Sequence, residues 1–134
     1  MSTPTLRSRY LSSSVTTSSP GRLLGMLWDR LVLDVTVAVD AMDAKDRATA
    51  STRLVHAQDI LMHLRSTLDL TVWPAGAQLA DLYVWCWQEL VEANLKQNVK
   101  KVRSVVPIVT RLRDTWQEAA RSGIPPTEGA EGRA

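Results

Sequence analysis

Two histidines, His56 and His63, with Asp59 between them, are the first residues whose types suggest chemistry. Imidazole and carboxylate groups can bind a metal ion when they converge on one point. On a single helix, ligands seven residues apart are separated by about 10 Å along the axis, too far for one ion at about 2 Å from each nitrogen. The spacing favours solvated polar residues, and no metal site is predicted.

The single cysteine, Cys86, is the second candidate. A nucleophile needs a base within hydrogen-bond reach and a third group that orients the base, and the sequence shows no such set. Cys86 lies on a stripe of apolar residues, which predicts a small core residue. No glycine-rich phosphate loop follows a strand, so no cofactor is predicted. A single cysteine cannot form a disulfide within the chain, so nothing indicates an oxidising compartment, and a cytoplasmic location is expected.

Four arginines could clamp an anionic metabolite between helices of a small enzyme: Arg22, Arg30, Arg53 and Arg65. Such a site needs charged groups that point into the bundle, whereas the charged residues placed by periodicity fall opposite the apolar stripes. A binding module is therefore favoured, with no catalytic residue. A small all-helical enzyme and a self-associating structural bundle remain the alternatives.

Composition limits the class of protein. The chain has 134 residues, 45% hydrophobic and 22% charged, which is typical of one folded domain. A net charge of +2 is too small to indicate a nucleic-acid partner. Aspartates and an arginine interrupt the apolar stretches, so we expect no membrane insertion. The hydroxyl-rich residues 12–19 replace the apolar run of a secretory signal, so none is expected.

Helical periodicity predicts the elements that must position these residues. Residues 1–19 are rich in Ser and Thr and predict a flexible arm, after which Ser19 and Pro20 form a cap and first turn. The valines at 35, 37 and 39 alternate as in a strand, but the length of the segment and its cap favour a helix over Leu23 to Met42.

Three further amphipathic helices follow, over residues 54–68, 79–93 and 102–119. Polar breaks at 43–46, 71–76 and 97–98 separate them. Pro107 lies inside the last helix and predicts a kink without an end, and Gly123 is predicted to close it. The sequence thus predicts an all-α fold, an antiparallel up-and-down four-helix bundle over residues 20–121, with a disordered tail over 122–134.

Five tryptophans and no phenylalanine supply the large rings. Trp116 fits a core stripe, whereas Trp28 and Trp85 need not. Large apolar residues outside a core stripe indicate a protein-binding groove or an oligomer interface. The alternative, that a tight bundle buries all five tryptophans, is about equally open.

Four runs, in order along residues 10–116, resemble the flagellar secretion chaperone family, FliS. They are Tyr10, Val15, Thr17, Ser19 and Pro20 with Leu23 to Asp29; Ala57 to Leu61 with Leu64, Leu68 and Asp69; Leu90 to Lys96; and Leu112 to Trp116. Trp28 stands where the family usually has tyrosine, and Thr67 where it has serine. Gly21, Arg22 and Pro107 are further departures.

The resemblance implies a chaperone that binds the disordered C-terminal region of flagellin in an extended apolar groove, prevents premature polymerisation and catalyses nothing. It also implies that the N-terminal arm, with Tyr10, Leu11 and Val15, acts as a lid on that groove. The groove residues are suggested by the apolar excess of the first helix, and they do not come from a correspondence with the family. They are Leu27, Trp28, Leu31 and Val35. The flagellar export apparatus and a second copy of the chain are further candidate partners.

Overall fold

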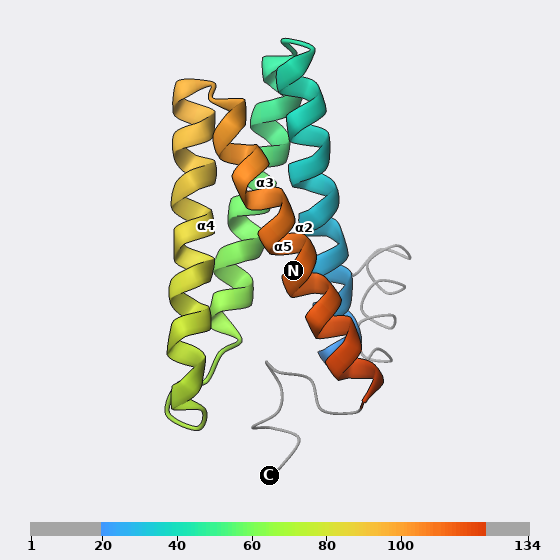
Figure 1. Cartoon of the computed structure of the whole chain (residues 1–134), viewed down its shortest axis with the longest axis vertical. Coiled ribbons are helices and arrows are strands. Elements are labelled where there is room, and N and C mark those ends of the chain that lie inside the picture. The colour runs from blue at the N-terminus through green and yellow to red at the C-terminus, as the bar shows by residue number, and fades with distance from the viewer. Residues whose placement is uncertain (1–19, 123–134) are drawn as a thin grey trace, which may run out of the picture.

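The computed structural model describes residues 20–122, which form four long helices (Figure 1). They are α2 (Pro20–Asp43), α3 (Arg47–Ser66), α4 (Ala77–Lys96) and α5 (Val99–Arg121), with the short 3-10 helix η1 (Pro74–Gly76) before α4. Within this range no strand occurs, so the predicted all-α fold is confirmed and the local strand alternative is wrong. The arm with Tyr10, Leu11 and Val15, and the tail from Gly123 onward, lie outside the described residues.

Each helix packs against the next, and α5 returns to α2, which closes an antiparallel ring. The α4–α5 contact is the least extensive of the four. Figure 1 shows α5 running obliquely from the top of α4 to the foot of α2. The up-and-down bundle predicted from short connections is thereby confirmed.

Local signals set the helix ends. After α2, Lys45 adopts φ 62°, and Asp46 caps α3 by accepting a hydrogen bond from the Thr49 amide at 3.1 Å. After α4, Gln97 adopts φ 51°, and Asn98 then accepts from the Lys100 amide at 3.1 Å to start α5. Short polar capping side chains satisfy the amides that a helix start leaves without partners, so these turns are tight.

The helix α5 continues through Pro107 to Arg121, as expected, while the kink itself stays a prediction. None of the described helices is long and apolar enough to cross a membrane.

The core occupies the bundle axis. The stripe predicted on the second helix is wholly buried, and its members are Leu54, Ala57, Leu61, Leu64 and Leu68. Trp28 and Tyr83 meet edge to face at the centre, with ring centroids 5.6 Å apart. Trp116 and Cys86 are buried, as predicted.

Candidate partner-binding surface

Three of the four groove residues predicted on α2 are core residues. Trp28 is 1% exposed, and Leu31 and Val35 are fully buried. The prediction that their side chains line a surface groove is therefore corrected. The physical reason is that α2 packs against both α3 and α5, which covers most of its wide apolar face.

Leu27, the fourth, lines a cavity of about 670 Å³ at the foot of the bundle. The start of α2 supplies Pro20, Leu23 and Leu24, and the end of α3 with residues 66–71 supplies the opposite wall, which includes His63. The arm joins α2 at this cavity, because Pro20 is the first residue of the helix.

The loop that forms one wall of this cavity is held by a carboxylate. Asp69 accepts hydrogen bonds from the Thr71 hydroxyl at 2.6 Å, the Thr71 amide at 3.1 Å and the Val72 amide at 3.3 Å. The hydrogen bond from the Thr71 side chain, followed by that from the Val72 amide, lowers the pKa of Asp69 below its ordinary value. The wall is thus fixed by local bonds to an ionised side chain.

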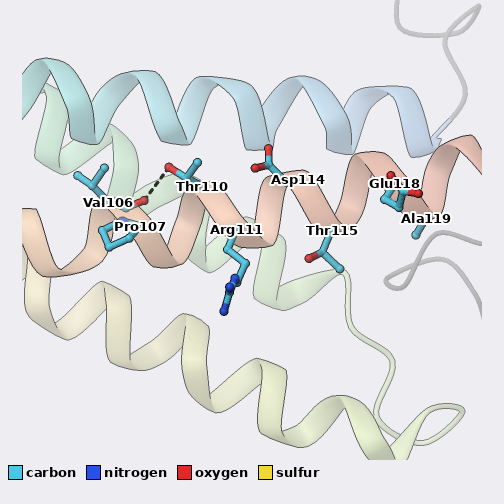
Figure 2. Close-up of a pocket in the computed structure, with 8 residues that line it drawn as sticks. All are labelled: Val106, Pro107, Thr110, Arg111, Asp114, Thr115, Glu118 and Ala119. Carbon is cyan, nitrogen blue, oxygen red and sulfur yellow. Dashed lines mark hydrogen bonds between the residues drawn. The ribbon is translucent and has the colours of Figure 1, made fainter.

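A second hollow of about 720 Å³ follows the outer face of α5 (Figure 2). Its described lining residues are Val106, Pro107, Thr110, Arg111, Asp114, Thr115, Glu118 and Ala119. Figure 2 shows Asp114 on the side of α2, whereas Arg111 and Thr115 point toward α4. This mixed surface was missed from the sequence, although Pro107 marks its upper end.

Several large apolar side chains remain exposed outside both hollows. They are Met26 (58%), Leu33 (47%), Val55 (46%), Val72 (57%), Trp85 (40%) and Leu95 (79%). The bundle leaves Trp85 and other large apolar side chains exposed, so the alternative that it buries all five tryptophans is wrong. Trp85 lies outside the core, whereas Trp28 lies within it.

The buried carboxylate of Asp34 was also missed. Asp34 is fully buried on α2 and accepts hydrogen bonds from Arg53 Nη1 at 3.0 Å and Arg30 Nε at 3.3 Å. His56 Nδ1 contacts its other oxygen. The expectation that charged residues fall opposite the apolar stripes is wrong here. The one sequence signal was Asp34 itself, an acid inside an apolar run four residues after an arginine.

The side chains around Asp34 include residues that were suggested above for an enzyme site and for a metal site. Two of the four suggested clamp residues, Arg30 and Arg53, engage Asp34 of the chain itself. His56 also faces Asp34, whereas His63 lines the cavity at the foot of the bundle. In residues 20–122 no group of three or more His, Cys, Asp or Glu side chains could hold a metal ion.

Burial keeps the thiol of Cys86 protonated. The thiol is fully buried, and desolvation, followed by the charge of Glu89, raises its pKa from 9.0 to about 12. A thiol that stays protonated at neutral pH is a poor nucleophile. Its environment is that of the core residue that the sequence predicted.

The fold defines a class, the antiparallel four-helix bundles. Comparison with known proteins gives the family. The model of the family described as flagellar protein FliS matches residues 3–123, and the chain belongs to this family. It is 30% identical over 125 residues to the flagellar secretion chaperone FliS of Bacillus subtilis strain 168, with 93% of each chain covered. The family resemblance of the sequence is thereby confirmed.

Proposed function

We propose that this protein is a cytoplasmic export chaperone that binds the C-terminal region of flagellin. Binding would prevent premature polymerisation and keep flagellin competent for secretion through the flagellar export apparatus, a further candidate partner. Membership of a family of flagellar secretion chaperones supports this proposal. The structural observation that carries it is the set of large apolar side chains left exposed on a well-packed bundle, with Leu95 at 79% and Met26 at 58%.

The mechanism follows from the cost of ordering a flexible chain. A disordered segment folds into helices when a partner surface buries its apolar face, and the burial offsets the entropy lost on ordering. An amphipathic helix lying in a shallow groove is a recurrent form of such recognition. While bound, that face is unavailable to neighbouring flagellin subunits, so the filament does not grow in the cytoplasm.

The arm is proposed as a lid. Tyr10 lies ten residues before Pro20, and an extended chain of that length reaches up to about 35 Å, close to the roughly 36 Å length of α2. Because the cavity at the foot of the bundle begins at Pro20, the apolar residues Tyr10, Leu11 and Val15 are all within reach of it. Deleting residues 1–15 should change the affinity for flagellin, and an unchanged dissociation constant would count against the lid.

Calorimetric titration with the last forty or so residues of the cognate flagellin tests the function. We expect saturable binding, a negative heat-capacity change and a gain of helix by circular dichroism. Lack of binding at high micromolar concentration would withdraw the flagellin assignment. The enzymatic alternative gains no support, because Arg30 and Arg53 already engage Asp34.

A further inference from the structure

The hollow along α5 has a described wall that comes from one helix alone. Every lining residue that the structure describes lies between Val106 and Ala119 of α5. Figure 1 shows α5 running obliquely away from α4 toward the foot of α2, and α4 adds no described residue to the lining. One row of side chains cannot enclose a space, so the second wall must come from residues outside 20–122 or from another molecule.

The described wall offers mostly hydrocarbon to an occupant. Val106, Pro107 and Ala119 are apolar. The hydroxyl of Thr110 donates a hydrogen bond to the Val106 carbonyl at 2.7 Å, which Figure 2 draws as a dashed line. Because this hydroxyl is satisfied within the helix, the methyl group is the part of Thr110 that is left for contact.

The wall also carries one cation that lacks a partner. Its two acids are already paired on α5 itself, Asp114 with Arg113 at 3.0 Å and Glu118 with Arg121 at 2.8 Å. Arg111 is the remaining charged lining residue, and the described part of the chain gives it no ion pair. A suitable occupant is therefore an apolar segment that ends in an acid.

The chain itself has a segment of this chemistry directly after α5. The apolar run Ile124, Pro125 and Pro126 is followed by Glu128. Proline fixes its own φ and restricts the residue before it to extended conformations, so this run loses little conformational entropy on docking. Gly123 precedes the run, and glycine tolerates the positive φ with which a chain reverses after a helix.

The lengths agree if the tail runs back along α5. Eleven residues separate Arg111 from Ser122, a helical distance of about 16 Å. Six residues separate Ser122 from Glu128, about 19 Å at the roughly 3.1 Å per residue of a proline-rich segment. Glu128 can thus reach Arg111, and Ile124, about 6 Å past Ser122, falls beside Ala119.

We propose that residues 123–128 fold back on the α5 hollow as a strap. The run from Ile124 to Pro126 covers the apolar wall, and Glu128 pairs with Arg111. The inference goes beyond the proposed function and does not depend on it. A partner that uses this hollow has to displace the strap first.

Charge and size distinguish the strap from two other occupants. The arm, residues 1–19, contains Arg7 and Arg9 and no acid, so it has no side chain that could pair with Arg111. A second copy of the chain needs roughly 800 Å² on each side for a stable interface. The hollow, about 20 Å long from Val106 to Ala119 and about one helix diameter of 10 Å wide, offers on the order of 200 Å².

Paramagnetic broadening of amide signals in the full chain tests the strap. Ala130→Cys carries a nitroxide label next to the strap, and buried Cys86 does not compete for the label. The amide of Arg111 is compared with that of Val55, which lies eleven residues before Ser66 at the foot end of α3, across the ring from α5. A docked strap should broaden the Arg111 signal and leave the Val55 signal sharp. Equal broadening of the two signals would overturn the strap.

Variants of the labelled chain identify the contacts. Ile124→Asp should abolish the preference for Arg111, and a preference that persists would contradict the apolar contact. Arg111→Glu should lower the ratio of docked to free strap about two- to five-fold, which corresponds to an exposed ion pair, and adding Glu128→Arg should restore the ratio. Failure of the double variant to restore it would contradict the pairing. Circular dichroism checks that each variant keeps the helical fold.

Two further samples assign the hollow to other occupants if the strap is wrong. A label at Ser12→Cys that broadens the Arg111 signal, where the label at position 130 does not, would identify the arm. Labelled chain mixed with isotope-enriched, unlabelled chain reports contacts between molecules. Broadening of Arg111 in the enriched chain as strong as that within one labelled chain would identify a second copy and overturn the strap. No flagellin is present in these samples, so the proposed function stands or falls separately.

Discussion

Replacing Asp34 with alanine tests whether one buried carboxylate holds α2 against α3. The side chain is fully buried, and it joins Arg30 on its own helix to Arg53 and His56 on α3. Its removal deletes these bonds and leaves three polar groups without their shared acceptor. The variant should therefore fold into the same bundle with a lower free energy of unfolding.

The exposure of the remaining groups sets the magnitude. Removing one member of a buried ion pair costs about 3–5 kcal/mol when the other charge stays buried. Here the side chains of Arg30 and His56 are 51% and 46% exposed, and that of Arg53 is 29% exposed, so all three can regain water. We therefore expect the lower end, about 3 kcal/mol, or a fall in melting temperature of roughly 10 °C.

Urea unfolding followed by circular dichroism at 222 nm measures this loss. Asp40→Ala is the matched control, because Asp40 is an exposed acid on the same helix, and its replacement should change stability by less than about 0.5 kcal/mol. If Asp34→Ala were as stable as Asp40→Ala, the cluster would contribute no net stability and our account of it would be wrong.

Three further predictions concern charge, thiol chemistry and backbone. The pKa of Glu92 is lowered by its bonds to Lys101 and Lys96. Its contribution to stability is thus present above its ordinary pKa of 4.5 and lost as the pH falls through the lower folded value, so urea midpoints of Glu92→Gln and the native chain should differ at pH 7 and converge once the pH is below the folded pKa. Cys86, with its pKa raised to about 12, should react with a disulfide reagent at pH 8 roughly a thousand times more slowly in the folded chain than in urea, and equal rates would contradict its burial. Pro107→Ala restores an amide within α5 and should raise the free energy of unfolding by about 2 kcal/mol, which thermal melts would detect; an unchanged or lower melting temperature would mean that the helix accommodates the proline without cost.

The helices were predictable from sequence because their signals are local. The cap at Asp46 and the cap at Asn98 act within three residues of each helix start. The apolar repeat of α3 needs no knowledge of the other helices, since a stripe about 100° wide can face only one core. Long regular elements separated by short polar breaks then leave few arrangements other than an antiparallel bundle.

The groove residues on α2 were not predictable in the same way. A helix with apolar residues around most of its circumference can bury any part of that face, and the choice depends on how many neighbours it has. Here α2 has two neighbours, so Trp28, Leu31 and Val35 are covered while Leu27 stays at the edge. The partners of Asp34 on α3 lie 19 and 22 residues away in sequence, and only the packed register brings them together.

The packed register also separates the stability of the bundle from its affinity for a partner, so single substitutions should change one and leave the other unchanged. An ion pair across a seam stabilises the helix order, and it makes that seam a poor site for an apolar helix, because docking would strip water from charged groups at a cost of several kcal/mol per ion. Asp34→Ala should therefore lower stability and leave flagellin affinity per folded molecule unchanged. Val55→Glu should leave the melting temperature within a few degrees and weaken binding. If both variants lost affinity in proportion to stability, binding would depend on the rigidity of the whole bundle and not on exposed apolar side chains such as Val55.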